Sequence, residues 1–403
     1  MNIIKKIYCR LFQLCFRIIL PILPYRNPII LNEMDRIIGV LNDKNIRKIL
    51  IATDKGIVRA GIVSLLTKVL EQGDIEYYIY DNTVANPTIS NVEEARKMYL
   101  DNKLEGIIAI GGGSAIDLAK IVAARIAKPN KEVRDMKGLL KINKKLPLLI
   151  AIPTTSGTGS EVTLAAVITD DKTHHKYPIN DFCLIPHYAV LDYKNTLGLP
   201  KNITSTTGMD ALTHAIEAYI GRSTTKETRK MSLEAVRLIV ENIEECYNNP
   251  LNEEARKKML YASHYAGIAF SKSYVGYVHA IAHTLGGKYN VPHGLANAVI
   301  LPIMLEIYGD SIYKKLKELA VYSKISNIDD NEHDAALKFI NWIYEINKKM
   351  SIPLNIDLIN NDDLDELVSH ALNEANPLYP VPVLMDKKEL KEVYLKLKNN
   401  KFY

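Results

Sequence analysis

Four histidines and one aspartate in the second half of the chain stand at spacings that suit a metal site. Asp210 and His214 are four residues apart, so on a helix they lie on one face, and His279 and His283 repeat this spacing. His293 precedes a further helical pattern. Carboxylate and imidazole ligands suit Fe²⁺ or Zn²⁺, and a set without thiolates is typical of catalytic sites that leave a position for substrate.

These histidines also have a structural interpretation. A lone histidine on an apolar helix is usually a hydrogen-bonded core residue, and an Asp-x-x-x-His pattern often arises by chance. Four of the ten histidines fall within the three segments, which favours a metal site. The spacing alone does not decide whether His279 or His283 is the ligand.

A glycine-rich turn in the first half is a candidate phosphate-binding site. The segment Gly111-Gly-Gly-Ser-Ala-Ile-Asp117 follows a strand pattern and opens a helix, and Ser114 and Asp117 fit a capping box. Glycines let the backbone approach a ligand closely, and N–H groups at a helix N-terminus attract anions. The turn is not a GxGxxG fingerprint, so a purely structural turn is the alternative.

Two further polar features follow strand patterns. Residues 153–161, Pro-Thr-Thr-Ser-Gly-Thr-Gly-Ser-Glu, are rich in hydroxyl groups and glycine and are suited to line a ligand groove. An ordinary polar loop is the alternative. The Asp54 carboxylate is placed to accept hydrogen bonds from a ribose hydroxyl and to repel a 2′-phosphate, unless it is an exposed turn residue.

The elements that position these residues differ between the two halves. Short apolar runs alternate with helical patterns in the first half, which predicts an α/β domain with a parallel sheet and flanking helices. Long helical patterns dominate from about residue 208, which predicts an all-α domain. The expected strands are 48–53, 75–80, 106–110 and 146–152, and the expected helices are 58–70, 92–100, 231–246, 253–269, 334–348 and 387–397.

The size and composition of the chain limit its function. A length of 403 residues favours two domains. The net charge of +5 is mild and spread out, which argues against nucleic-acid binding. The four cysteines form no CxxC pair, so a cytoplasmic location is expected. We assign residues 1–27 to an N-terminal extension, 28–203 to a dinucleotide-binding domain and 204–403 to a helical metal-binding domain, with the boundary in the turn-rich stretch 197–207.

The extension, residues 1–27, contains five basic residues and no acidic one, and its apolar residues recur at helical spacing. Its apolar run is too short and too interrupted by charge and proline for a signal peptide or a spanning helix. Two interpretations stay open. The helix packs on the protein's own surface or on a subunit partner, or it lies as a basic amphipathic helix on a membrane surface.

Taken together, the motifs resemble the iron-dependent (group III) alcohol dehydrogenases. They occur in the order typical of that family, from about residue 45 to near the C-terminus. The matching segments are Gly111–Asp117, Pro153–Thr158, Gly208–Glu217, His279–His283 and Pro292–Asn297.

The resemblance implies a homodimeric enzyme that transfers a hydride between a small alcohol or aldehyde and NAD, or alternatively NADP, in a cleft between the domains. One Fe²⁺, or alternatively Zn²⁺, would be held by Asp210, His214, His279 and His293. His283 would lie beside the nicotinamide as the catalytic residue. The cofactor would contact Asp54, Asn86, Gly112, Gly113, Ser114, Asp117, Thr154, Thr155, Thr158, Val167 and Lys176.

Three departures from the family pattern leave the substrate open: the extension 1–27, Thr284 where proline is frequent, and the segment 376–382. One alternative is a dehydroquinate-synthase-like or glycerol-dehydrogenase-like enzyme that uses NAD and a metal on a polyol or sugar phosphate. The synthase relatives typically hold the metal with a glutamate and two histidines, which the Asp210-x-x-x-His214 pattern disfavours. The other alternative is a membrane-associated or assembly protein with a vestigial site.

Overall fold

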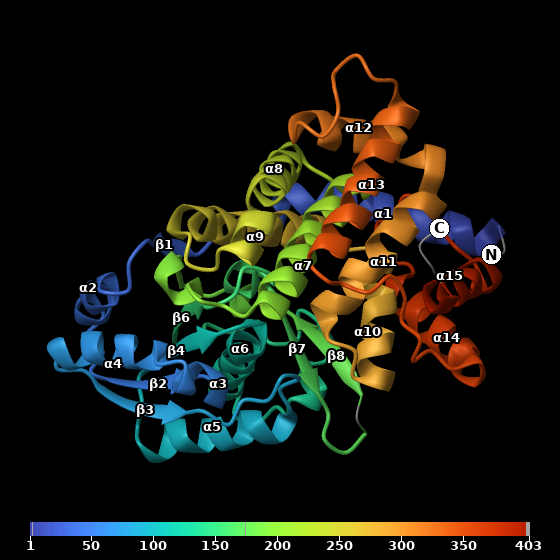
Figure 1. Ribbon diagram of the computed structural model, residues 1–403. Coiled ribbons are helices and arrows are strands. Elements are labelled where there is room, and N and C mark those ends of the chain that lie inside the picture. The colour runs from blue at the N-terminus through green and yellow to red at the C-terminus, as the bar shows by residue number, and fades with distance from the viewer. Residues whose placement is uncertain (2, 174, 400–403) are drawn as a thin grey trace. The chain divides into compact units, whose positions relative to one another are not determined.

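The computed structural model describes residues 1–403 except 2, 174 and 400–403 (Figure 1). The chain divides into two compact units. One unit is formed by residues 24–197, and the other is formed by residues 1–23 together with 198–403. Residues 1–23 of the N-terminal extension therefore belong to the helical unit, although they precede the α/β unit in the sequence, whereas residues 24–27 belong to the α/β unit.

The α/β unit is built on a parallel sheet of six strands in the order β1-β9-β6-β4-β2-β3. Strands β4 and β6 are buried along their whole length, which explains why they are continuous apolar runs in the sequence. The strands of this sheet are β1 (Ile29–Leu31), β2 (Lys48–Ala52), β3 (Glu76–Tyr80), β4 (Gly106–Gly111), β6 (Leu148–Pro153) and β9 (Tyr188–Val190).

Side chains alternate between the two faces of this sheet and build two cores. Leu50 and Ile107 pack in the core that includes α5 (Ile89–Asp101) and α6 (Gly113–Ala127). Ile51 and Ile108, one residue further along each strand, pack in the core that includes α2 (Arg36–Asp43) and α4 (Ile62–Gln72). The predicted fold class of a parallel sheet with flanking helices is confirmed.

A second small sheet was not predicted. It consists of β5 (Gly138–Leu139), β8 (Lys176–Asn180) and β7 (Ala165–Thr169), and β7 pairs with β8 in antiparallel fashion. Pro178 lies within β8 and lacks an N–H group, and such a residue normally argues against a strand.

One predicted helix was wrong. The helix expected over 58–70 is two helices, α3 (Lys55–Arg59) and α4, because Gly61 adopts a φ of +75° between them. The division between the two units, between residues 197 and 198, lies within the expected stretch 197–207, and α7 begins in the same stretch at Lys201, after Pro200. The hydroxyl groups of Thr206 and Thr207 donate to carbonyls one turn back, at 2.7 Å each. This bonding accommodates polar residues in a helix.

The second unit is helical from Lys201 onward among the described residues. No single helix there or elsewhere in the described chain is long and apolar enough to cross a membrane; one bent pair, 293–311 with 313–322, meets that test by length and composition only. The helices are α7 (Lys201–Ile220), α8 (Lys226–Asn248), α9 (Glu253–Ser273), α10 (Tyr277–Tyr289), α11 (His293–Tyr308), α12 (Tyr313–Tyr322), α13 (Glu332–Lys349), α14 (Leu364–Ala375), α15 (Lys387–Asn399) and α1 (Ile3–Ile19).

Candidate metal centre and nucleotide site

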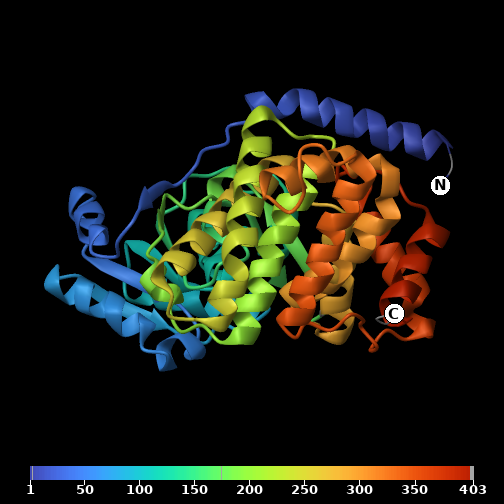
Figure 2. The same ribbon diagram turned by 45° about the horizontal axis from the view of Figure 1, so that its top comes forward.

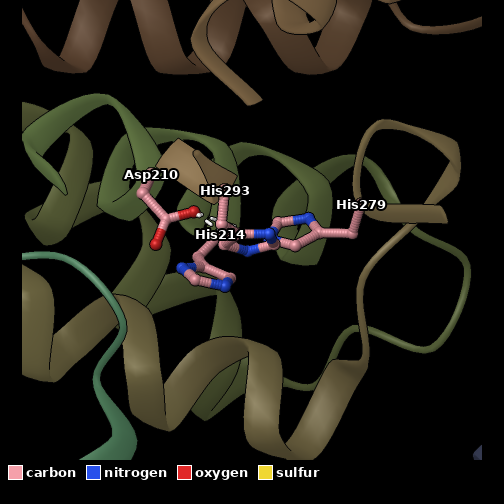
Figure 3. Close-up of side chains that lie close together, drawn as sticks. All are labelled: Asp210, His214, His279 and His293. Atoms are coloured by element: carbon pink, nitrogen blue, oxygen red, sulfur yellow. Dashed lines mark ion pairs between the residues drawn. The ribbon is translucent and has the colours of Figure 1, made fainter. Parts of the chain in front are cut away.

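Four side chains from three helices converge inside the helical unit (Figure 3). Asp210 and His214 lie one turn apart on α7, His279 lies on α10 and His293 begins α11. Each offers one ligand atom, and the four atoms all lie within 4.8 Å of one another. Oδ1 of Asp210 is 3.5 Å from Nε2 of His293 and 4.0 Å from Nε2 of His279.

Glycines allow the close helix packing that brings these residues together. A Cβ atom on Gly294, at the start of α11, would lie 2.3 Å from the carbonyl oxygen of Thr206 on α7. A Cβ atom on Gly208 would lie 2.8 Å from Ile243 of α8. The close backbone contact at Gly294 places His293 beside Asp210 and His214 of α7.

Glu217 orients His279. Its Oε2 lies 2.6 Å from Nδ1 of His279, and its carboxylate also accepts the backbone N–H groups of Gly276 and Val278 at 2.9 Å each. A Cβ atom on Gly276 would lie 2.6 Å from Oε1, so glycine is needed there. A carboxylate behind a histidine in this way fixes the ring and leaves Nε2 for a metal. The sequence analysis included Glu217 in a motif but assigned it no role, although its position two turns after Asp210 on the same helix is a usable signal.

Burial controls the charge of this pair. Desolvation raises the pKa of the Glu217 carboxyl to about 7 and lowers the pKa of His279 well below its usual value. His279 is therefore a neutral imidazole, the form that binds metals.

The buried carboxylate of Asp210 fits a cation. Asp210 is only 2% exposed, and among the described residues no lysine or arginine forms an ion pair with it. Asn297 of α11 approaches the same centre, with Nδ2 at 2.6 Å from Oδ1 of Asp210 and 3.2 Å from Nε2 of both His279 and His293. A carboxylate facing three imidazoles and away from water would be costly without a positive partner, and a divalent metal is such a partner.

His283 lies beside this cluster and is not one of its four members. Its ring stacks on His293 with centroids 5.2 Å apart and an interplanar angle of 18°. Nδ1 is 2.6 Å from Oε1 of Glu374 on α14, which also accepts the hydroxyl of Tyr379 at 2.7 Å. The structure thus brings His279, and not His283, into the four-residue candidate metal cluster, and it gives His283 a carboxylate partner that the sequence analysis missed.

The glycine turn of the α/β unit is shaped by the threonines of the segment 153–158. A Cβ atom on Gly113 would lie 2.8 Å from Thr158, and one on Gly112 would lie 3.6 Å from Thr155. Gly112 is the N-cap of α6, and no side chain caps this helix. The first-turn N–H groups of α6 therefore face the turn without a side-chain acceptor.

The predicted capping box at this turn was wrong. The Ser114 hydroxyl donates to the carbonyl of Ala85 at 2.6 Å. The Asp117 carboxylate accepts from the Ser160 hydroxyl at 2.6 Å and from the Val167 N–H at 3.0 Å. Because α6 begins earlier, at Gly113, both residues are already inside the helix and their side chains tie it to neighbouring segments.

The remaining candidate cofactor residues also lie around this end of the sheet. Oδ1 of Asp54 caps α3, and Oδ2 lies 3.6 Å from where a Cβ atom on Gly111 would be. Lys176 donates to Oδ1 of Asn86 at 2.9 Å. The hydroxyl of Thr154 is fully buried and has no hydrogen-bond partner among the described residues.

Lys120, which the sequence analysis missed, donates hydrogen bonds to the chain that includes and follows the hydroxyl-rich segment. Its side chain is fully buried, and Nζ donates to the Ser160 hydroxyl at 3.1 Å and to the carbonyls of Thr163 at 3.0 Å and Ala165 at 2.7 Å. Burial lowers its pKa to about 8. The lysine therefore fixes the course of the chain after Thr158.

Comparisons with known proteins agree with this geometry. The family model "Iron-containing alcohol dehydrogenase" matches residues 30–193, and "Fe-containing alcohol dehydrogenase family, C-terminal" matches residues 204–397. Alcohol dehydrogenase 4 of Saccharomyces cerevisiae is 37% identical over 339 residues, which is 83% of this chain and 87% of that protein. Lactaldehyde reductase of Escherichia coli is 33% identical over 345 residues, covering 84% and 90%. A solved structure of 1,3-propanediol oxidoreductase matches with a TM-score of 0.88 at 31% identity, covering 93% of this chain and 99% of that one.

The chain therefore belongs to the iron-containing alcohol dehydrogenase family. It is a metal-dependent oxidoreductase that acts on small alcohols or aldehydes with a nicotinamide cofactor. The dehydroquinate-synthase-like and glycerol-dehydrogenase-like alternatives are not favoured by these relatives.

Proposed function

We propose that the enzyme is an Fe²⁺-dependent, NAD-linked alcohol dehydrogenase and aldehyde reductase. The observation that carries this proposal is the convergence of Asp210, His214, His279 and His293, four donors without a thiolate, inside the helical unit. One carboxylate and three imidazoles form a donor set that suits Fe²⁺, and Zn²⁺ is the competing metal.

The bound groups supply the redox chemistry: the metal acts as a Lewis acid toward the substrate oxygen, and the nicotinamide accepts or donates the hydride. The protein's own contribution is to hold a proton in the right place. Glu374 accepts the Nδ1–H of His283, which leaves Nε2 of that ring to exchange a proton with the alcohol oxygen. The Tyr379 hydroxyl donates to the same carboxylate and holds it in position.

The cofactor site that we propose combines backbone and side chains. The open first turn of α6 at Gly112, Gly113 and Ser114 suits the pyrophosphate. Thr154, Thr155, Thr158, Asn86, Val167 and Lys176 would line the groove, and Asp117 would act through Ser160 and Val167 rather than touch the cofactor. Asp54, whose carboxylate faces Gly111, favours NAD over NADP because it would repel a 2′-phosphate.

The first test is reconstitution. The protein would be purified without air and stripped of metal, and NADH oxidation would be followed with a panel of short aldehydes before and after adding Fe²⁺ or Zn²⁺. We expect activity only with metal, and more with Fe²⁺ than with Zn²⁺. Activity of the metal-free protein, or equal activity with NADPH, would contradict the corresponding part of the proposal.

The role of His283 has a separate test. His283→Ala is expected to keep the metal and lose turnover, whereas His279→Ala is expected to lose both. Glu374→Gln, which keeps the size of the side chain, should lower kcat and shift its pH profile while metal content stays unchanged, because the carboxylate acts through His283. Loss of metal in His283→Ala would show that the ligand assignment is wrong.

A further inference from the structure

Helix α1 carries its apolar side chains on the outside. At 3.6 residues per turn, Ile4, Ile7, Leu11 and Ile18 fall in one continuous sector together with Leu14. Ile4 is 72% exposed, Ile7 54%, Leu11 56% and Ile18 66%. Figure 2 shows α1 lying along the outside of the helical unit. The exposures of these residues mean that no other described part of the chain covers the sector. A helix that merely covered its own protein would bury such a sector.

The inner side of α1 is held largely by polar contacts. Arg10 donates to the carbonyls of Val381 and Pro382 at 2.7 and 2.9 Å. The buried Gln13 donates to the carbonyls of Pro377 and Tyr379 at 3.3 and 2.7 Å.

A few apolar contacts on the inner side of α1 hold the helix in the same rotation about its axis. Cys9 is buried in the core of the helical unit, and Phe16 meets the ring of Tyr274 edge to face at 5.1 Å. These contacts set the rotation of α1, so the apolar sector cannot turn inward without breaking them.

We propose that the outer sector of α1 binds the surface of a membrane that contains anionic lipids. The exposed Tyr8 and Ile19 extend the apolar surface of this sector toward Lys5, and Ile3 extends it on the other side toward Lys6 and Arg17. Residues 1–27 contain no aspartate or glutamate. In such a helix the apolar face enters the boundary between headgroups and acyl chains while the basic residues reach the phosphate groups. Helix α1, at 17 residues with internal charges, lies on the bilayer and does not cross it.

The charges favour lipid over a second copy of the chain as the occupant. Pairing two such sectors would bring the basic edges of both copies together without an acidic partner from residues 1–27. A phosphate-bearing lipid surface is complementary to both edges at once. The proposal is independent of the catalytic site, because the outer residues of α1 take no part in the metal or cofactor clusters.

The test compares the full-length enzyme with two triple variants in vesicle co-sedimentation. The vesicles contain phosphatidylcholine alone or phosphatidylcholine with phosphatidylglycerol. The test variant is I7D/L11D/I18D. The matched control is L251D/I328D/L358D, which places the same charges on exposed apolar residues elsewhere in the helical unit, where Leu251 is 67%, Ile328 74% and Leu358 60% exposed. Dehydrogenase activity of each variant confirms that it is folded.

We expect the wild type and the control variant to bind the anionic vesicles, and the test variant to bind roughly tenfold or more weakly. Replacing Lys5, Lys6 and Arg17 by glutamine should weaken binding by about fivefold for each charge removed and abolish its salt dependence. Failure of the wild type to bind, or equal binding by I7D/L11D/I18D, would overturn the proposal.

Two further measurements test whether the sector is a subunit interface and whether it enters the lipid surface. Light scattering tests whether a second copy of the chain covers the sector. If I7D/L11D/I18D changes the molar mass and the wild type does not bind vesicles, the sector is a subunit interface and the lipid assignment is overturned. The homodimer expected from the sequence is examined by the same measurement. Cys15 is exposed at the margin of the sector, so an environment-sensitive fluorophore on it should shift to the blue with anionic vesicles and not with neutral ones.

Discussion

The metal cluster and the glycine turn specify a site in opposite ways. The metal cluster depends on which side chains stand at four positions, and its surroundings, such as Glu217 behind His279, orient those side chains. The proposed cofactor turn at Gly112 and Gly113 depends on the absence of side chains, which would let the backbone itself face the cofactor. The first kind of site fails when a functional group is removed, and the second fails when an atom is added.

The largest expected effect comes from removing a ligand. Asp210→Ala takes away the only carboxylate of the cluster, so the protein should lose its metal, and kcat/KM should fall by at least about a thousandfold. Metal content measured by atomic emission and activity should fall together. Asp310→Ala, on an exposed acid after α11, is a control that should retain both. Full metal content in Asp210→Ala would contradict the idea that side chains specify this site.

Adding one methyl group tests the other kind of site. In Gly113→Ala the new Cβ would meet Thr158 at 2.8 Å, so we expect the KM for NADH to rise by about tenfold while metal content stays unchanged. The double variant Gly113→Ala with Thr158→Ala should recover part of this loss, measured against Thr158→Ala alone. Unchanged KM in Gly113→Ala would show that the backbone of this turn does not approach the cofactor.

The charge of Asp54 tests how the proposed cofactor site distinguishes NADH from NADPH. Asp54→Asn keeps an oxygen that can cap α3 but removes the negative charge that faces Gly111. We expect kcat/KM for NADPH to rise by about tenfold relative to that for NADH. The ratio of the two values in steady-state assays measures this, and an unchanged ratio would place the 2′ position away from Asp54.

The smallest effect concerns His187, a half-buried histidine outside the metal cluster. Burial and nearby Arg26 lower the pKa of His187 in the α/β unit to about 4, below its ordinary value of 6.5. Between these values the unfolded chain binds a proton that the folded chain does not, so this residue makes stability fall as the pH drops from 6.5 to 4.

His187→Asn can still accept the N–H of Leu149, which the wild-type ring accepts at 3.1 Å, but it cannot be protonated. Urea unfolding of wild type and variant at pH 7 and pH 5 should show that the variant loses about 1–2 kcal/mol less on acidification. His370→Asn, at an exposed position on α14, should lose as much as the wild type. Identical pH dependence in His187→Asn would contradict the assigned pKa shift.

The sequence predicted the parts of both sites that depend on local spacing. Asp210 and His214 are four residues apart, which places them on one helix face, and the apolar runs of β4 and β6 predict buried strands. The partners that support the sites were missed, because they are distant in the chain. Glu374 lies 91 residues from His283, and Lys120 reaches a segment more than 40 residues away.

Helix α1 illustrates a different limit. Its amphipathic pattern predicts a helix and two faces, but the pattern does not say which face turns inward. Gln13, a polar residue, is buried, whereas Ile4 is exposed, because the carbonyls of the segment 377–382 need donors. Tertiary hydrogen bonding therefore reverses the orientation that hydrophobicity alone would favour.

The contacts of α1 with the segment 377–382 also connect the N-terminal helix to the residues around His283, so that a truncation would affect both. Three prolines leave this segment short of N–H groups, and Arg10 and Gln13 cap four of its carbonyls. The segment carries Tyr379, whose hydroxyl holds Glu374 against His283. Removing residues 1–23 would therefore remove the contacts that hold Tyr379, and through it Glu374, in place beside His283. We expect a shortened chain to differ from the full enzyme in catalysis as well as in its outer surface.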